Sequence, residues 1–154
     1  MSVPRAYSAL LKTEPKSRTV SVHFPEHPGV ITYGRDWDEA AQMAAEALNA
    51  ALEAEFDRDL ELPPAKKVKA KRNERVIQVR LDPEIWMAFV VRDWRKRADL
   101  TQKEMAKRLG ISYQAYQRIE RPGRSNLTVG TLEKIAESLH GELIIDLKLP
   151  AKSA

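Results

Sequence analysis

Two short stretches near the N-terminus alternate between apolar and polar or small residues. The apolar positions of the first stretch are Tyr7, Ala9 and Leu11. Those of the second stretch are Val20, Val22 and Phe24. A period of two is typical of strands with one buried face. Glu14–Ser17 between them has the proline and serine of a turn, so we expect a hairpin. A third strand is predicted at Val30–Tyr33, ended by Gly34.

A long amphipathic helix is predicted directly after this third strand. Asp36 and Glu39 have the spacing of a capping box at a helix start. A long helix on one face of a small antiparallel sheet predicts an α+β first domain. The apolar residues that follow the cap recur at helical spacing and form one stripe: Ala40, Ala44, Ala47, Leu48, Ala51, Leu52 and Phe56.

The second half of the chain is predicted to be mostly helical. A fourth strand at Ile77–Leu81 leads into a helix that begins with a cap and an N1 proline, Asp82 and Pro83. The final segment, Glu142–Leu149, alternates again and predicts a C-terminal strand after an all-α domain. Between them, three helices are predicted from hydroxyl N-caps, over residues 101–110, 112–120 and 128–139.

A basic, proline-containing stretch separates the two halves. Residues 62–75 read LPPAKKVKAKRNER and have few apolar side chains to bury, which is typical of an exposed linker. We therefore expect a first domain over 1–64, a basic linker over 65–75 and a second domain over 76–150.

Composition excludes several classes of protein. The chain has 154 residues, of which 43% are hydrophobic, which suits a folded globular protein. It has no cysteine, and this excludes disulfide scaffolds, cysteine zinc sites and thiol nucleophiles. No apolar run approaches the ~18 residues of a membrane span, and the N-terminus has no signal-peptide pattern. We expect a cytoplasmic protein with no membrane partner.

Charge is unevenly distributed along the chain. Residues 1–64 hold six Lys/Arg and eleven Asp/Glu, a net charge of −5, whereas residues 65–82 carry +5 and residues 83–154 carry +4. An acidic first half joined to a basic second half suggests two partners of opposite charge. The alternative is that each set of charges is only a solvated face.

Residues 101–120, TQKEMAKRLGISYQAYQRIE, have helix-turn-helix spacing. Ala106 stands where two helices cross closely, Gly110 stands at the turn, and Tyr116 is expected in the core. The segments LTQKEMAKRLGIS and QRIERPG resemble the phage-repressor, or XRE, class of helix-turn-helix. The second helix would then enter the major groove, where Gln pairs with adenine and Arg with guanine. Its predicted base-contacting residues are Tyr113, Gln114, Gln117 and Arg118.

A second set of residues is predicted to hold the DNA backbone. Gln102 begins the first helix of the motif, a position that commonly holds phosphate in this class. Phosphate contacts fix the register of a protein on the duplex. The remaining predicted phosphate contacts are Ser112, Arg121, Arg124, Asn126 and Thr128.

The first half resembles the HicB antitoxin family. The resemblance rests on Tyr7, on VSVHFPEHPGVITYG at 20–34, on DWDEAAQMAAEAL at 36–48 and on LPP at 62–64, in that order. The resemblance implies a degenerate ribonuclease H-like α+β fold. It also implies that this domain neutralises HicA, a small basic toxin that cleaves mRNA. Such antitoxins often add a C-terminal DNA-binding module. The predicted toxin contacts are Val20, Val22, Phe24, Pro25 and Pro28.

Catalysis is not expected. The acidic residues at 36–39 suit a helix cap and its dipole, and a ribonuclease H-type enzyme would need converging carboxylates on its strands. His23 and His27 are separated by Pro25, which makes a shared metal site improbable. We predict no catalytic residue, no metal and no cofactor.

The sequence therefore predicts an antitoxin of a type II toxin-antitoxin system. It would bind a HicA-like toxin and repress its own operon by binding double-stranded operator DNA. We expect a homo-oligomer, a dimer or tetramer. The C-terminal strand would pair with the tail of a second copy, pair with the strand at 76–81 of its own chain, or stay frayed. The alternative is a stand-alone regulator with a ligand-sensing first domain.

Overall fold

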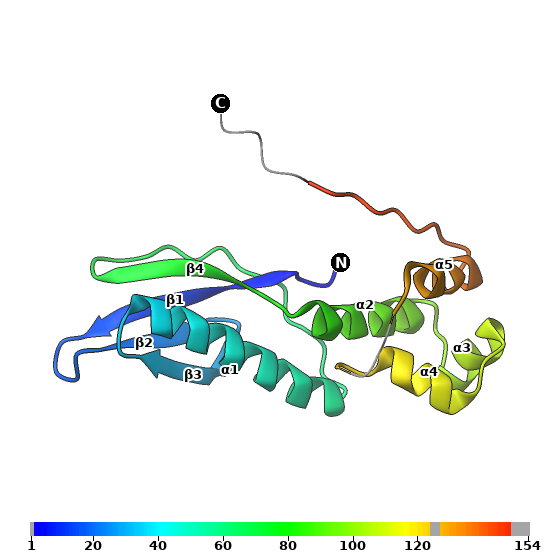
Figure 1. Ribbon diagram of the computed structural model, residues 1–154, viewed down its shortest axis with the longest axis horizontal. Helices are drawn as coiled ribbons and strands as arrows, with labels where there is room; N and C mark the ends of the chain where they lie inside the picture. The colour runs from blue at the N-terminus through cyan, green and yellow to red at the C-terminus, as the bar shows by residue number, and fades with distance from the viewer. Residues whose placement is uncertain (1, 124–126, 149–154) are drawn as a thin grey trace.

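The computed structural model describes residues 2–123 and 127–148. Within them, a four-stranded sheet with one long helix is followed by a helical module (Figure 1). This confirms the predicted α+β fold followed by an all-α domain. The strands are β1 (Ala6–Glu14), β2 (Thr19–Phe24), β3 (His27–Gly34) and β4 (Glu74–Arg80). The helices are α1 (Trp37–Asp57), α2 (Pro83–Arg97), α3 (Gln102–Leu109), α4 (Tyr113–Glu120) and α5 (Val129–Ser138).

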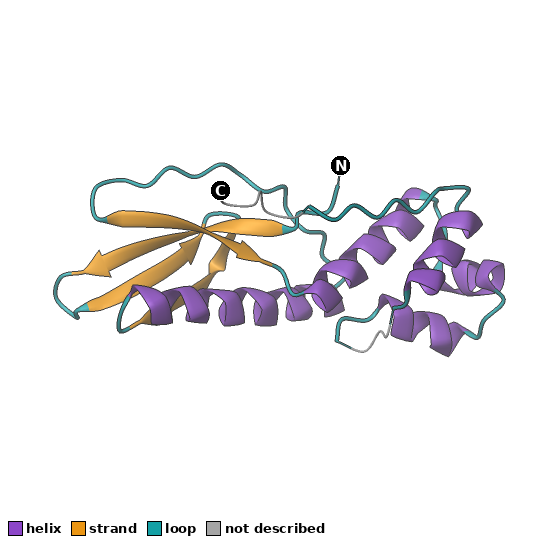
Figure 2. Ribbon diagram, turned by 45° about the horizontal axis from the view of Figure 1, so that its top comes forward, coloured by secondary structure: helices purple, strands orange, loops and turns teal. Residues whose placement is uncertain are grey.

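The sheet is antiparallel, with the order β3-β2-β1-β4. The predicted hairpin forms between β1 and β2 and pairs Leu11 with Val22. The alternating apolar residues of these strands all point to one face, where α1 covers them (Figure 2). The opposite face of the sheet carries the polar positions of these strands. The segment between α1 and β4 crosses this face, and Ser8 Oγ of β1 donates a hydrogen bond to the Lys66 carbonyl at 3.3 Å.

Helix α1 begins at the predicted cap. Asp36 Oδ1 accepts hydrogen bonds from the backbone N–H groups of Asp38 at 3.0 Å and Glu39 at 2.8 Å. The Glu39 carboxylate accepts from the backbone N–H and side chain of Arg35, so the capping box is only half formed. Ala40, Ala44, Leu48, Leu52 and Phe56 of the predicted stripe are buried. None of the helices in the described part of the chain is long and apolar enough to cross a membrane.

Gly34 joins β3 to α1 at a position that excludes side chains. A Cβ atom there would overlap the backbone nitrogen of Ala40 in the first turn of α1. We expect Gly34→Ala to lower the free energy of unfolding by about 3 kcal/mol, because neither backbone segment can give way. Chemical denaturation would measure this. Gly29→Ala, which meets no atom within 4 Å, is the matched control, and equal effects of both changes would contradict the packing argument.

The fourth strand belongs to the first domain, which corrects the predicted boundary at residues 65–75. β4 pairs with β1 along its length, from Ala6 opposite Arg80 to Lys12 opposite Glu74. The first half of α2 also packs into the first core, whereas Val91 belongs to the second. The boundary between the two cores therefore lies inside α2. Alternation shows which face of a strand is buried but not which strand lies beside it.

The predicted C-terminal strand is not formed in residues 142–148, and Leu149 lies outside the described residues. A strand needs a hydrogen-bonded neighbour, and none of the described strands reaches this tail. Residues 142–148 do not form the suggested pairing with the strand at 76–81 either, and β4 pairs with β1 on one side only, as the edge strand of the sheet. The tail instead exposes Ile144 at 79%, Ile145 at 60% and Leu147 at 84%.

Candidate nucleic-acid interface

The caps of α3 and α4 set the turn between them. Thr101 and Glu104 form a reciprocal capping box, in which the Glu104 N–H donates to Thr101 Oγ1 at 3.2 Å. Gly110 ends α3 in the left-handed region, with φ of +66°. Ser112 Oγ then accepts from the N–H of Ala115 at 3.1 Å and begins α4. Each of these positions was predicted from local sequence.

The two helices pack around small and aromatic side chains. Ala106 is 3% exposed, which allows the close crossing, and Tyr116 is fully buried, as predicted. Both lie in one core with Val91 of α2 and Ile135 of α5. Burial raises the pKa of the Tyr116 hydroxyl well above its ordinary value. This packing fixes which face of α4 points outward.

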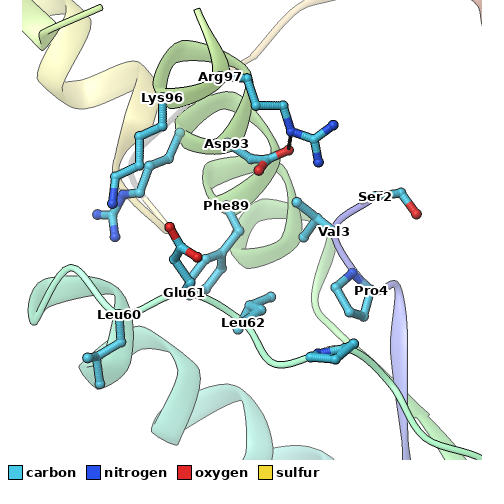
Figure 3. A pocket seen from close by; sticks show the side chains of 12 residues that line it. Ser2, Val3, Pro4, Leu60, Glu61, Leu62, Phe89, Asp93, Lys96 and Arg97 are labelled. Atoms are coloured by element: carbon cyan, nitrogen blue, oxygen red, sulfur yellow. Dashed lines mark ion pairs between the residues drawn. The ribbon is translucent and has the colours of Figure 1, made fainter. Parts of the chain in front are cut away.

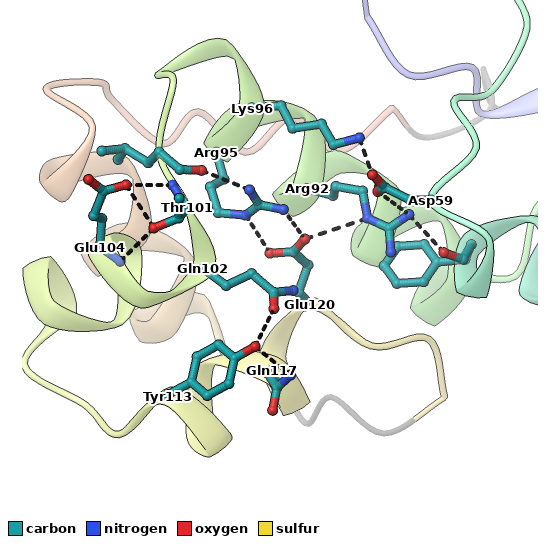
Figure 4. Close-up of polar contacts among 12 residues, drawn as sticks. Asp59, Arg92, Arg95, Lys96, Thr101, Gln102, Glu104, Tyr113, Gln117 and Glu120 are labelled. Atoms are coloured by element: carbon teal, nitrogen blue, oxygen red, sulfur yellow. Dashed lines mark hydrogen bonds and ion pairs between the residues drawn. The ribbon is translucent and has the colours of Figure 1, made fainter.

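The outward face of α4 carries the predicted base-contacting residues: Gln114, Gln117 and Arg118 are exposed, and Tyr113 is half-buried. Figure 4 shows Tyr113 and Gln117 of this set beside Gln102. Gln117 Nε2 donates to the Tyr113 hydroxyl at 2.9 Å, and that hydroxyl donates to Gln102 Oε1 at 3.4 Å. The amide groups therefore form a connected row from the start of α3 along α4. Amides and a guanidinium on one helix face suit the edges of adenine and guanine.

Two of the predicted phosphate contacts, Gln102 and Arg121, lie beside this face. Gln102 is the first residue of α3, and Arg121 is exposed just after α4. Ser112 and Thr128 are N-caps, and Thr128 Oγ1 accepts from the N–H of Thr131 at 3.1 Å. Their hydroxyl oxygens already hold helix starts, so they can reach phosphate only as donors. Arg124 and Asn126 lie outside the described residues.

A buried ion-pair network that we did not predict supports α4 from behind. Glu120 is 1% exposed and accepts from Arg95 Nε at 2.8 Å and Arg95 Nη2 at 2.6 Å. Arg92 Nε lies 3.5 Å from the same carboxylate. The hydrogen bonds to Glu120 raise the pKa of Arg95, whereas burial lowers that of Arg92. The burial of Glu120 could have been predicted from helical spacing, because Glu120 follows the core residue Tyr116 by four positions and therefore lies on the same face of α4.

Three of the five predicted toxin contacts are core residues, which corrects that prediction. Val20, Val22 and Phe24 are 4%, 0% and 1% exposed and face α1. The error has a simple cause, since the apolar set of an alternating strand is the set that packs inward. Pro25 and Pro28, at the turn between β2 and β3, are exposed and remain available for contact.

The opposite side of the same strands exposes a different set. Ser21 and His23 of β2 pair in register with Tyr33 and Ile31 of β3. Tyr33 is 69% and Ile31 is 63% exposed, although both side chains are large and apolar. We call Ser21, His23, Ile31 and Tyr33 the open-face patch. Glu14 adds a carboxylate at its edge, where Ser21 Oγ donates to Glu14 Oε1 at 3.0 Å.

The structure separates His23 from His27. His27 is buried, with Nδ1 3.2 Å from Glu55 Oε1 and its ring packed edge-on against Tyr7. His23 is exposed on the opposite face of the sheet. Across residues 2–123 and 127–148, no group of three or more His, Asp or Glu side chains could hold a metal ion.

Comparison with known proteins gives two family matches that overlap on α2. A family model described as HicB_like antitoxin of bacterial toxin-antitoxin system matches residues 7–102, and a helix-turn-helix model matches residues 91–143. The chain is also similar to the N-terminal domain of Burkholderia pseudomallei antitoxin HicB. That similarity has 15% identity and a TM-score of 0.39, and covers 50% of this chain and 98% of that chain. No curated protein matches the chain significantly.

Proposed function

Because the chain belongs to the HicB_like antitoxin family of bacterial toxin-antitoxin systems, we propose that it neutralises a HicA-like, mRNA-cleaving toxin and represses its own operon. The first domain would bind the toxin, and α3 and α4 would bind operator DNA. The observation that carries the proposal is the pair of family matches on one chain, the second of which covers the helices with the exposed amide row.

We propose the open-face patch as the toxin contact, in place of the buried residues of β2. Contiguous exposed apolar side chains mark protein interfaces, and Ile31 and Tyr33 are the largest such pair on the sheet. The first half of the chain carries a net charge of −5, which favours encounter with a basic toxin. Glu14 places part of that charge at the patch itself.

Replacing Ile31 and Tyr33 together with serine is expected to weaken toxin binding by about 100-fold, because each large interface side chain contributes about 1–2 kcal/mol. The measurement is inhibition of mRNA cleavage by the purified toxin, using the full-length antitoxin. Leu60→Ser with Val129→Ser is the matched control, because both side chains are large, apolar and exposed elsewhere. Unchanged inhibition by a folded Ile31→Ser/Tyr33→Ser chain would remove the patch from the interface.

The C-terminal tail is proposed to join two copies of the chain. Its apolar side chains are exposed and residues 142–148 have no strand partner among the described residues, so this segment is free to pair with the same tail of a second copy across a two-fold axis. A chain truncated after Gly141 is expected to sediment as a monomer and to lose most of its operator affinity, since one module covers only one half-site. If the truncated chain stays folded and keeps the full-length oligomer mass, the tail does not build the dimer.

The ligand-sensing alternative gains no support from the cavity in the first domain. This cavity lies between the N-terminal segment, residues 60–64 and α2, and has a volume of about 120 Å³ (Figure 3). Small-molecule sites usually enclose about 300–1,000 Å³. Residues 60–64 instead pack against the first domain ahead of the linker, where the Tyr7 hydroxyl donates a hydrogen bond to the Pro63 carbonyl at 2.6 Å. A short basic reading frame beside this gene would favour the antitoxin; its absence would favour the stand-alone regulator.

A further inference from the structure

The C-terminal end of α1 lies against the DNA-reading side of the helix-turn-helix. Figures 1 and 2 both place this end beside the segment that follows α4. Asp57 and Asp59 form one wall of a cleft of about 400 Å³. The other wall holds residues predicted to contact DNA: Gln102, Gln114, Gln117, Arg118 and Arg121.

A second cleft lies between α1 and the segment that follows α4. Glu53 and Asp57 of α1 line it together with Arg121, Pro122 and Gly123, and its volume is about 260 Å³. The approach is close, because a Cβ atom at Gly123 would lie 3.6 Å from Glu53 Oε1. Glu53, Asp57 and Asp59 of the first domain therefore line clefts that also hold Arg118 of the reading helix and Arg121 just after it.

Cations of α2 hold the end of α1 in this place (Figure 4). Arg92 Nη1 donates to the Phe56 carbonyl at 2.9 Å, and its guanidinium carbon stands 3.1 Å from the centre of the Phe56 ring. Lys96 Nζ lies 3.0 Å and Arg92 Nη1 lies 3.4 Å from Asp59 Oδ1. Helix α1 has no basic residue in its own last turn, so these side chains also neutralise its negative C-terminal dipole.

We propose that this arrangement is autoinhibitory: the end of α1 occupies the space that the DNA backbone must enter, and its carboxylates face Arg118 and Arg121 across the cleft. The proposal rests on the proposed DNA-reading function. A helix in a major groove about 12 Å wide has a phosphate backbone on each side. The end of α1 lines the same cleft as the reading residues, so it stands on the side where one of these backbones would run.

Opening requires the end of α1 to separate from α4. The two belong to different cores, Phe56 to the first and Tyr116 to the second, and α2 is the element that both cores share. A bend of α2 between Phe89 and Val91 would therefore open the cleft without dismantling either core. DNA and the α1 carboxylates then compete for one surface, so DNA affinity depends on the fraction of open chains.

A cleavable crosslink tests the proposal directly, since the chain has no cysteine of its own. Glu53→Cys with Pro122→Cys, joined in the full chain by a short, thiol-cleavable bismaleimide, locks α1 against the segment after α4. The probe is a duplex carrying the promoter region of the chain's own gene, at fixed salt. We expect the crosslinked chain to bind at least about tenfold more weakly than the same chain after cleavage. Glu46→Cys with Glu53→Cys, two turns apart on α1, is the control crosslink and should change nothing.

Equal binding before and after cleavage would overturn the proposal, as would failure of the folded chain to crosslink. If the cleaved chain does not prefer the promoter duplex to a scrambled one, the DNA-reading function itself fails, and the proposal fails with it.

Charge variants give an independent measurement. Asp57→Asn with Asp59→Asn should raise affinity for the promoter duplex about fivefold or more above the effect of Glu133→Gln with Glu137→Gln. The second pair removes the same charge from exposed positions of α5, away from the cleft. Equal gains from both pairs would mean that general electrostatics, and not occlusion, explains the effect, and would overturn the proposal.

Discussion

Replacing Glu120 with alanine is expected to lower the free energy of unfolding of the helix-turn-helix module by about 3–5 kcal/mol. Glu120 is buried and faces Arg95 and Arg92, both of which are also buried. Removing the carboxylate leaves Arg95 without its ion-pair partner and leaves Arg92 with only the exposed Asp59. Burial already lowers the pKa of Arg92 against the attraction of Glu120, so the desolvation cost of its guanidinium is substantial.

Urea denaturation followed by circular dichroism would measure this loss. Glu133→Ala, an exposed carboxylate on α5, is the matched control and should change stability by no more than about 0.5 kcal/mol. Glu120→Gln keeps an acceptor for Arg95 and should fall between the two. A loss below about 1 kcal/mol for Glu120→Ala would mean that the pair behaves as a surface salt bridge, which would contradict its role in holding α4.

Replacing Gln114, Gln117 and Arg118 together with alanine is expected to weaken operator binding by about 100-fold or more, because each lost base contact costs about 1–3 kcal/mol. All three side chains are exposed and α4 is held from behind, so the fold should survive. Binding to a scrambled duplex should change much less, since phosphate contacts carry non-specific affinity.

Two comparisons separate base reading from general charge. Gln102→Ala should weaken operator and scrambled duplexes alike, because its predicted partner is phosphate. Glu133→Ala with Lys134→Ala and Glu137→Ala changes three exposed positions of α5 and should leave the operator preference intact. If the α4 triple variant binds the operator unchanged at the same salt concentration, α4 is not the reading helix.

Elements defined by local signals could be predicted from the sequence. The Asp36 cap, the Thr101–Glu104 capping box, the left-handed Gly110 and the Ser112 cap all formed where their residue types predicted them. Caps and turns depend on backbone groups a few residues away, so a short stretch of sequence contains the needed information.

Features that depend on distant neighbours could not be predicted in this way. The alternation at residues 77–81 predicted a strand, but its place beside β1 in the first domain depends on which edge is free. The exposed face of β3 could be identified only once α1 was known to cover the other face. Likewise, Asp59 was one acidic residue among many until the fold brought it beside Lys96 and Arg92.

A chain that neutralises a toxin through its first domain, as we propose, must stop mRNA cleavage by that toxin. The toxin is the product of the short basic reading frame expected beside this gene, and the full-length chain is titrated against it. We expect cleavage to stop near one antitoxin chain per toxin, and the Ile31→Ser/Tyr33→Ser chain to fail at that ratio. Undiminished cleavage in the presence of excess folded wild-type chain would show that the chain does not neutralise this toxin.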